Sequence, residues 1–582
     1  MARKHGQTNY FIEGEGFVGE QEIRQGVQPF ARALLQDVQP NTELDAERAF
    51  RFSRMFADLP KFRPDPEALV ELGKTMDDTP NFKDHQSLPA GFTYLGQFID
   101  HDITFDKTEG LPTSELEPEE IIQGRSPSLD LDSVYGRGPD LETKPLYESD
   151  RLHLRTGITT ELPFDPNEPE AFKLPNDLPR GDNAERALDA TLGDPRNDEN
   201  LAVAQTHLAF LKFHNVVVNQ LQQFGHSGSD LFDRAREIVT LHYQWIILND
   251  FLPRIVLPAI LKKVLVNGGQ FFKPTPGEEA PMPIEFSVAA YRFGHSMIRD
   301  VYSWNRNFAD ATLGQLFIFS GVSGDMVGLP TLPSNWPIDW RRFYDFKDAP
   351  GVEPPPALNL TRSIDTGLAM TLRELPEFVG QGNNAALAVR NLLRGRLLGL
   401  PTGQAIAEAI GVTMLTPEQV RQGPHANVLK KHKFDTQTPL WYYILKEAEV
   451  FNEGQRLGPV GSQLVVETFV GLIQGSQTSL LSNANQYWRP SLPSLRPGQF
   501  TMVDLLLLVN DLNPLGDERI PTPPPPPPPL THVVQPGETL GTIAAKFLGD
   551  SKRWREIFEA NRDKITEPNL IRPGMELIIP NH

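Results

Sequence analysis

The sequence GQFIDHD at residues 96–102 decides how the rest of this chain is interpreted. If this stretch is helical, Gln97 and His101 are four residues apart and share one face, while Asp102 is turned by about 100° from His101. A histidine between two aspartates is more often a surface imidazole with a raised pKa than a metal ligand or an acid–base catalyst. The stretch therefore marks a candidate site, and the other polar motifs decide its meaning.

A second polar stretch, SPSLDLDSVYG at residues 126–136, alternates hydroxyl and carboxylate side chains. In an extended loop, Ser126, Ser128, Asp130 and Asp132 would turn their oxygens to one side, and oxygen cages of this kind bind hard cations such as calcium. The stretch is not an EF-hand, because the glycine and glutamate of that loop are missing. A plain polar turn is the alternative interpretation.

Two later stretches carry an arginine and a second histidine. In GDPRNDENL, residues 193–201, an aspartate before proline followed by an apolar periodic run predicts the start of a helix, with Arg196 and Glu199 in its first turn. In YRFGHSMI, residues 291–298, His295 stands in a mostly apolar segment, where a histidine is more often a core residue than a ligand. Each motif is weak when taken singly.

In this order, GQFIDHD, LDLDSVYG (129–136), GDPRNDE (193–199) and RFGH (292–295) resemble the animal haem peroxidases, the superfamily of myeloperoxidase and peroxidasin, with this chain as a bacterial-like member. The resemblance runs from about residue 92 to about residue 490. The catalytic part of that family is one large, mainly helical domain around the haem. We therefore expect a mainly α domain over residues 1–519, although length alone would suggest three domains. Periodic apolar residues predict helices at 201–222, 234–252 and 385–398.

The resemblance implies a role for each motif residue. His101 would be the distal histidine with Gln97 beside it, Arg196 the distal arginine, and His295 the proximal ligand of the haem iron. The other residues implied to bind haem b are Asn391, which would accept the N–H of the proximal imidazole, Arg292, which would pair with a propionate, and Asp100 and Glu199, which match two carboxylates that form ester bonds to haem methyl groups.

A calcium site beside the distal histidine is also implied by the resemblance. Its ligands would be Asp102, Ser126, Asp130, Asp132 and the carbonyl of Ser128. The chain departs from myeloperoxidase at Asn200, where that protein has a methionine that forms a third haem link. A sulfonium bond is therefore excluded, which argues against the strongest chloride-oxidising behaviour.

These residue types suit peroxide chemistry. A neutral imidazole such as His101 is able to take the proton of a peroxide and return it to the leaving oxygen. Arg196 would stabilise the negative charge that develops on that oxygen. We expect a peroxidase that uses hydrogen peroxide to oxidise halides, pseudohalides or small organic donors such as phenols.

Two other functions are weighed against this one. Fatty-acid dioxygenases of the same superfamily carry a radical-forming tyrosine three residues before the proximal histidine, whereas this chain has Arg292; Tyr291, one position away, is expected to face elsewhere on a helix. A non-catalytic glycan-binding scaffold is the second alternative. It would not need His101, Arg196 and His295 together.

The C-terminal part is set off by a proline run. Residues 523–529 are all proline, which predicts an extended spacer of roughly 20 Å within a linker at 520–530. Residues 531–581 resemble a LysM domain, a small α+β unit in the order βααβ, with helices at 543–547 and 554–561, a closing strand at 575–580 and Thr539 as an N-cap. The resemblance implies binding of glycans that contain N-acetylglucosamine, in peptidoglycan or chitin, with protein docking as the alternative. The glycan-binding residues would be Gly537, Glu538, Thr539, Leu540, Asn569, Ile571 and Arg572.

Composition excludes several classes of protein. The 582 residues carry a net charge of −20, which disfavours nucleic acid and anionic membranes as partners. The chain has no cysteine, so thiolate-ligated haem, iron–sulfur clusters and disulfides are excluded. No apolar run is long enough to predict a membrane span, and the first residues have no leader pattern. We expect a cytoplasmic protein, or one that reaches a cell wall by a leaderless route.

Overall fold

The computed structural model describes residues 50–77, 83–106, 117–118, 121–142, 144–162, 172–181, 188–228, 230–276, 278, 280–324, 326–375, 385–516 and 530–580. Contacts divide the chain into a larger unit, which ends at Asp517, and a C-terminal unit after it. Each unit has a hydrophobic core of its own. Of the linker expected at 520–530, residues 520–529 lie outside the described residues, as do residues 1–49, whereas Leu530 already belongs to the first strand of the C-terminal unit.

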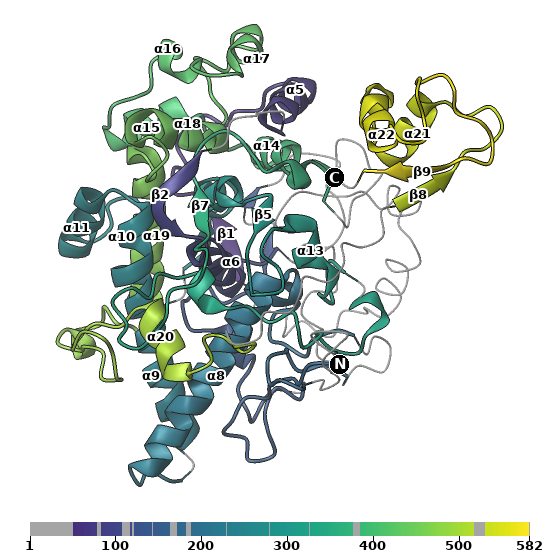
Figure 1. Cartoon of the computed structure of the whole chain (residues 1–582). Helices are drawn as coiled ribbons and strands as arrows, with labels where there is room; N and C mark the ends of the chain where they lie inside the picture. The colour runs from purple at the N-terminus through teal and green to yellow at the C-terminus, as the bar shows by residue number, and fades with distance from the viewer. Residues whose placement is uncertain are drawn as a thin grey trace, which may run out of the picture. The chain divides into compact units, whose positions relative to one another are not determined.

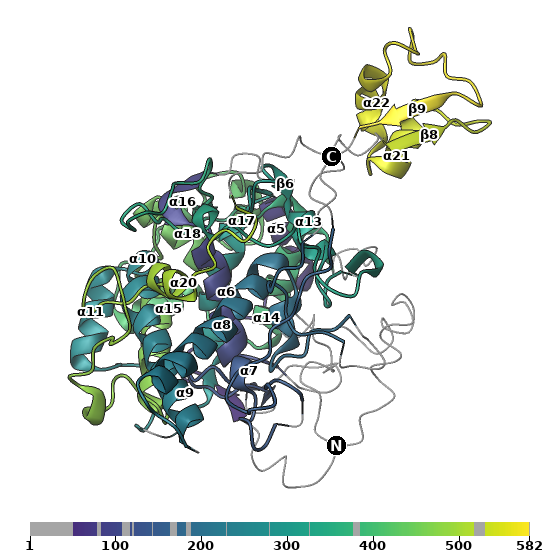
Figure 2. The ribbon, with the colours of Figure 1, turned by 60° about the horizontal axis from the view of Figure 1, so that its bottom comes forward.

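The larger unit is mainly helical, as expected (Figures 1 and 2). Its longer helices are α5 (Pro66–Asp77), α6 (Gly91–Ile103), α8 (Leu201–Gln223), α9 (Leu231–Ile246), α11 (Pro258–Asn267), α14 (Leu387–Leu397), α15 (Gly403–Ile410), α18 (Leu440–Asn452), α19 (Pro459–Gly475) and α20 (Met502–Val509). Shorter helices are α7 (Asp132–Tyr135), α10 (Leu252–Ile255), α12 (Ile284–Ser287), α13 (Leu313–Ile318), α16 (Pro417–Val420) and α17 (Ala426–Lys431). Two 3-10 helices that carry motif residues are η2 (Pro195–Asp198) and η4 (Ala290–Met297).

Strands are short and lie between the helices. They are β1 (Phe50–Ser53), β2 (Asp84–Pro89), β3 (Ile122–Gln123), β4 (Met282–Pro283), β5 (Val301–Tyr302), β6 (Ala311–Thr312) and β7 (Leu360–Arg362). Strand β1 pairs antiparallel with β3 and parallel with β4, while β2 pairs with β7 and β5 with β6. These small sheets join distant segments, but the helices supply most of the core.

The three helices that apolar periodicity predicts are present as α8, α9 and α14. Their bounds differ from the predicted ones by a few residues, except that α9 ends at Ile246 and continues into a π-helical turn, η3 (Ile247–Phe251). The helix start predicted at Asp194 and Pro195 divides into two elements, because Arg196 lies in the 3-10 helix η2 and Glu199 precedes α8. Helix α8 begins at Leu201, where the Asn200 side chain accepts a hydrogen bond from Val203 N at 3.0 Å.

Helix α6 carries the first motif into the interior of the larger unit (Figure 2). It contacts α8, η2, η4 and α7. Its apolar residues Leu95, Phe98 and Ile99 are fully buried, and the Phe98 ring stacks on that of Phe210 from α8 at 4.6 Å. This packing fixes the rotation of α6 and with it the directions in which His101 and Asp102 point.

The turn before Arg196 lies close to the SPSLDLDSVYG loop. A side chain at Gly193 would place its Cβ only 2.3 Å from the carbonyl oxygen of Ser133, so no larger residue fits there. The Asp194 N–H donates to the same carbonyl at 3.2 Å. The glycine thus lets two motifs that are 60 residues apart in sequence meet through their backbones.

The C-terminal unit has the expected order of strand, two helices and strand. It consists of β8 (Leu530–Val533), α21 (Leu540–Phe547), a short 3-10 turn, α22 (Trp554–Ala560) and β9 (Glu576–Ile579). Strands β8 and β9 pair antiparallel, from Leu530 with Ile579 to Val533 with Glu576. Thr539 is the N-cap of α21, as predicted, and its hydroxyl accepts from Thr542 N.

Across the part of the chain that the structure describes, no helix combines the length and the apolar character that crossing a bilayer requires.

Candidate active site

One cavity of the larger unit collects residues from the first, third and fourth motifs. The empty space among its lining residues is about 1330 Å³, which includes solvent at its open mouth. The polar residues that line it are Gln97, Asp100, His101, Arg196, Glu199, Asn200, Arg292 and His295. Apolar residues of α6, η4, α13 and α14 complete the walls: Phe92, Phe293, Met297, Leu313, Phe317 and Leu387. The cavity therefore pairs two histidines with an otherwise largely apolar enclosure.

His101 lies at the inner end of α6 and is 5% exposed. Its Nδ1 is 2.9 Å from Asn197 Oδ1, and its Nε2 is 3.7 Å from Glu199 Oε2. Burial, followed by the charge of Arg196, lowers the pKa of His101 to about 3. The imidazole is therefore neutral at ordinary pH, contrary to the raised pKa that is usual for a histidine between two aspartates.

Arg196 is held in place by several acceptors. Its Nη2 donates to Asp194 at 2.8 Å and to the carbonyl of His101 at 3.0 Å, and its guanidinium lies 4.3 Å from the centre of the Phe105 ring. Burial raises the pKa of Asp194, but the charges of Arg125 and Arg196 outweigh burial and hold this pKa well below its usual range. A fixed cation thus borders the cavity on the side of His101.

Gln97, Glu199 and Asn200 form a hydrogen-bonded group beside His101. Gln97 Nε2 donates to Glu199 Oε2 at 2.8 Å, and Asn200 Nδ2 donates to Gln97 Oε1 at 3.1 Å. The helix-start residue Asn200 therefore also orients the side chain of Gln97. As the sequence predicts, Gln97 and His101 share a face of α6, since both line the cavity.

Asp100 also lines the cavity and is partly exposed to it. Burial raises the pKa of its carboxyl, while the charges of Arg196, Arg292 and His295 act in the opposite direction. Arg196 belongs to η2, whereas Arg292 and His295 belong to η4. Charges from both elements therefore act to lower the pKa of the Asp100 carboxyl, against the effect of burial.

His295 contacts Asn391 of α14, but the amide is turned the other way from the orientation implied by the resemblance. Asn391 Nδ2 lies 2.8 Å from His295 Nδ1, and Asn391 Oδ1 accepts from Arg292 Nη1 at 2.6 Å. The expected acceptor role of Asn391 toward the imidazole is therefore wrong for this structure. The reason is the guanidinium of Arg292, which attracts the amide oxygen more strongly than an imidazole does.

Tyr291 lines the same cavity, so the expectation that it faces elsewhere is also wrong. Its hydroxyl donates to the carbonyl of Gly96 at 3.2 Å, and its ring stacks on Phe286 at 4.8 Å. Residues 290–297 form a 3-10 helix, and every residue from Tyr291 to His295 lines the cavity. Tyr291 therefore reaches the cavity without sharing one helix face with His295.

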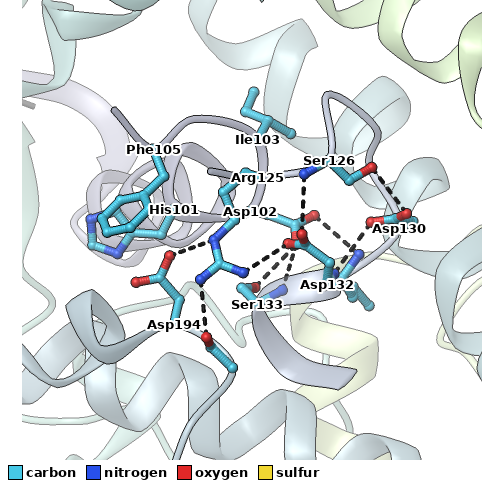
Figure 3. Close-up of polar contacts among 12 residues, drawn as sticks. His101, Asp102, Ile103, Phe105, Arg125, Ser126, Asp130, Asp132, Ser133 and Asp194 are labelled. Atoms are coloured by element: carbon cyan, nitrogen blue, oxygen red, sulfur yellow. Dashed lines mark hydrogen bonds and ion pairs between the residues drawn. The ribbon is translucent and has the colours of Figure 1, made fainter. Parts of the chain in front are cut away.

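Asp102 points away from the cavity toward the second motif, as Figure 3 shows. Carboxylate oxygens of Asp102, Asp130 and Asp132 all lie within 4.8 Å of one another. Ser126 Oγ donates to Asp130 Oδ2 at 3.3 Å, and Ser133 Oγ donates to Asp102 Oδ1 at 3.0 Å. Burial, followed by the charges of Asp132 and Asp130, raises the pKa of Asp102 well above its usual value. Ser128 is buried in the same loop.

Arg125 links this carboxylate cluster to Asp194, two residues before Arg196, and no role for Arg125 was predicted from the sequence. It lies between the cluster and Asp194 (Figure 3), donating to Asp194 Oδ2 at 2.7 Å and to Asp132 Oδ1 at 3.3 Å. Its side chain is fully buried. An arginine directly before SPSLD and an aspartate directly before proline are the only local signals, and neither predicts this contact across 69 residues.

Asn197 and His207 are further residues that sequence reasoning missed. Asn197 stands inside the third motif, and His207 follows on α8; both are fully buried. Asn197 Nδ2 lies 2.9 Å from His207 Nδ1, while its Oδ1 meets His101. A buried histidine on a mostly apolar helix gave no signal of this connection.

The expected glycan loops of the C-terminal unit are mainly exposed. Glu538 Oε2 accepts from Gln535 N at 2.8 Å and lies 2.6 Å from His532 Nε2. The exposed loop residues are Gly537, Thr539, Asn569 and Arg572, whereas Ile571 is half-buried against the core of the unit. Leu540 is buried in that core, so its side chain packs and only its backbone is able to contact a glycan.

Known families match both units. Residues 107–320 match the family described as "Animal haem peroxidase", and residues 532–580 match the LysM domain. The larger unit is thus similar to animal haem peroxidases over part of its length, and the C-terminal unit is similar to LysM domains. The matched peroxidase residues include Arg196 and His295, whereas His101 lies just before them.

Relatives with peroxidase names match part of the chain, and a solved structure shares its fold. A peroxidase-like protein of Margaritifera margaritifera is 28% identical over 261 residues, which cover 36% of this chain and 32% of that protein. Thyroid peroxidase of Rattus norvegicus is 26% identical over 405 residues, which cover 64% of this chain and 39% of that protein. The chain thus spans about a third of the length of these relatives. Peroxidase A of Dictyostelium discoideum shares the fold with a TM-score of 0.53 at 17% identity, over 81% of this chain and 95% of that one.

Proposed function

We propose that this chain is a haem peroxidase that uses hydrogen peroxide to oxidise halides, pseudohalides or small organic donors, and that its LysM domain holds it on a glycan containing N-acetylglucosamine. The observation that carries the proposal is the cavity lined by His101, Arg196 and His295, with Asn391 in contact with His295 from outside the cavity lining. This set combines a neutral base, a fixed cation and a candidate iron ligand around one space.

The residues present fit a haem. His101 and His295 line one open cavity, apolar side chains of four elements form much of its walls, and imidazole is a common iron ligand where no cysteine exists. His295 would hold the iron through an unprotonated Nε2, which requires the His295 proton on Nδ1 and the oxygen of Asn391 turned toward that proton. Arg292 would support the same side, and Asp100 and Glu199 are the carboxylates available for ester bonds to the macrocycle. When bound, the haem supplies the redox chemistry.

The chain's own contribution is to move a proton and to stabilise charge. His101 is neutral because of its lowered pKa, so its Nε2 is able to take a proton from a peroxide in the cavity. Arg196 is immobilised by Asp194 and by the carbonyl of His101, so it needs no rearrangement to stabilise negative charge on the departing oxygen. Gln97, oriented by Asn200, provides a further polar group beside the same space.

We also propose that calcium binds to Asp102, Asp130 and Asp132, with Ser126 and the Ser128 carbonyl completing the site. The three carboxylates lie close together, and burial raises the pKa values of Asp102 and Asp132, with the charges of Asp132 and Asp130 adding to the rise at Asp102. A hard cation with oxygen ligands relieves this repulsion. Because Asp102 follows His101 directly, the cation would also hold the inner end of α6.

The peroxidase proposal is tested with the full chain loaded with haemin. We expect a Soret band and peroxide-dependent oxidation of iodide or a phenol, and a loss of about 10²- to 10⁴-fold in His101→Ala. The matched control is His153→Ala, because His153 lies outside the cavity beside Asp150 and Asn219. Absence of a Soret band, or full turnover by His101→Ala, would contradict the proposal.

Ester bonds are tested by extracting the haem with acidified organic solvent after peroxide turnover. We expect part of the haem to stay with the protein, and Asp100→Asn together with Glu199→Gln to release all of it. Complete extraction from the wild-type chain would show that neither carboxylate forms an ester.

Glycan binding is tested by sedimentation with peptidoglycan and with chitin. We expect deletion of residues 530–582 to abolish co-sedimentation and to leave peroxidase kinetics unchanged, since each unit has its own core. The double variant Asn569→Ala/Arg572→Ala changes only exposed side chains and should weaken binding without unfolding. Unchanged sedimentation of the deletion variant would refute the tether and leave protein docking as the role of LysM. Binding to wall glycan would also give the chain a cell-wall association.

A further inference from the structure

A buried amide connects the histidine of the cavity to a second histidine that does not reach the cavity. Asn197 of η2 is fully buried, with Oδ1 2.9 Å from His101 Nδ1 of α6 and Nδ2 2.9 Å from His207 Nδ1 of α8. Three separate elements therefore meet at one side chain. Neither Asn197 nor His207 lines the cavity.

The chemistry of an amide couples the protons of the two rings. The amide oxygen only accepts hydrogen bonds and the amide nitrogen only donates them, whereas each ring nitrogen of a neutral imidazole either donates or accepts. Both contacts of Asn197 are hydrogen bonds only if one of the facing ring nitrogens carries a proton and the other does not. In this arrangement His101 Nδ1 carries the proton, His207 Nδ1 accepts, and His101 Nε2 keeps its lone pair.

The surroundings of His101 favour this distribution. Its Nε2 lies 3.7 Å from Glu199 Oε2, which is too far for a hydrogen bond, and Gln97 already donates to that oxygen at 2.8 Å. A proton on Nε2 would therefore form no hydrogen bond with Glu199. On the other side of the amide, His207 packs edge-on against Phe98, with ring centres 5.9 Å apart.

We propose that Asn197, oriented by His207, is a positioning residue that keeps the proton of His101 on Nδ1 and so presents an unprotonated Nε2 to the cavity. The proposal rests on the peroxidase function proposed above. When a peroxide O–H bond breaks, its proton forms the new N–H bond at Nε2, and the Nδ1–H···Oδ1 hydrogen bond stays in place to stabilise the resulting imidazolium. Without the amide, Nε2–H becomes an accessible tautomer that is not able to accept a proton there.

The test uses two nearly isosteric variants of the haem-loaded chain, Asn197→Leu and Asn197→Asp. Leucine removes both hydrogen bonds, whereas aspartate keeps the oxygen that faces His101. Two rates are followed by the Soret band: the reaction with peroxide, and the binding of cyanide, which arrives as HCN and must give its proton to a base. We expect both rates to fall by about 10- to 100-fold in Asn197→Leu and to stay within a few-fold of the wild type in Asn197→Asp.

His207 is tested in the same assays. We expect His207→Phe to slow both reactions, and the double variant with Asn197→Leu to be no slower than Asn197→Leu alone, because the two residues act in one chain. The matched control is Asn215→Leu on the same helix, since Asn215 binds only the backbone of Leu154. Its rates should equal those of the wild type. If Asn197→Leu fails to hold haem, His207→Phe decides the question, because it leaves Asn197 in place.

Wild-type rates in both Asn197→Leu and His207→Phe, or equal losses in Asn197→Leu and Asn197→Asp, would overturn the proposal. The second result would assign Asn197 a purely structural role. These outcomes differ from a failure of the peroxidase function, which would show as a wild-type chain without a Soret band or as a His101→Ala variant that reacts normally.

Discussion

The two histidines of the cavity each face an asparagine, but the two amides are turned in opposite directions. On the α6 side, His101 Nδ1 meets the amide oxygen of Asn197, whereas on the η4 side His295 Nδ1 meets the amide nitrogen of Asn391. The orientation of each amide follows from the residue at its other end. Asn197 uses its nitrogen for the neutral ring of His207, and Asn391 gives its oxygen to the cation of Arg292.

A histidine–asparagine pair therefore does not by itself fix which end of the amide faces the imidazole. An amide has one donor end and one acceptor end, so the strongest outside partner decides which end the imidazole receives. The arrangement suits the α6 side to proton transfer, since a lone pair faces the cavity. The η4 side is instead tied to a positive charge. The two sides of the cavity should therefore respond differently to substitution.

The largest expected effect comes from the histidines themselves. His295→Ala should lower haem affinity by more than about 100-fold, because it removes the proposed iron ligand, whereas His101→Ala should keep the haem. Transfer of haem to apomyoglobin measures both. Equal haem loss in the two variants would mean that the two sides of the cavity do not have separate tasks.

A smaller effect separates the two asparagines. Asn391→Leu should lower haem affinity by about 10- to 100-fold, because Asn391 supports the proposed iron ligand, and Asn197→Leu should leave it unchanged. Transfer of haem to apomyoglobin measures the haem affinity of both variants. If Asn197→Leu released haem as readily as Asn391→Leu, both amides would serve only to hold the pocket together.

Calcium removal should act on the α6 side alone. At a free calcium concentration ten times the dissociation constant, binding stabilises the folded chain by about 1.4 kcal/mol. We expect chelation to lower the melting temperature and Asp130→Asn to remove the dependence on calcium, as followed by calorimetry. The control is Asp150→Asn, because Asp150 contacts His153 and lies outside the carboxylate cluster. A melting temperature that is the same with calcium and with chelator would argue against the site.

The smallest change is expected in the dependence of the peroxide reaction on pH. A base with a pKa of 6.5 would lose about 30-fold of its active form at pH 5. Burial and Arg196 lower the pKa of His101 to about 3, so the neutral form persists and the rate should fall less than about twofold between pH 7 and pH 5. Stopped-flow rates in several buffers measure this. A fall centred near pH 6.5 would show that His101 is not protected from protonation.

Much of the cavity follows from the order of the motifs. GQFIDHD, GDPRNDE and RFGH placed His101, Arg196 and His295 in one family site, and the structure brings these residues to one cavity. Helical periodicity predicted that Gln97 shares the face of His101. Tyr291 was misplaced, because the sequence does not show that the cavity borders every residue from Tyr291 to His295.

The residue types, their spacing, the N-cap of α21 and the separation of a small βααβ unit from a large helical one follow from the amino-acid sequence alone. These properties are local, so short-range rules of backbone geometry and capping are sufficient. Only the tertiary structure decided the contacts of Arg125 with Asp194, of Asn197 with His207 and of Arg292 with Asn391. Each joins separately placed elements, and the choice of donor or acceptor at each amide depends on a partner that packing of the core brings into reach.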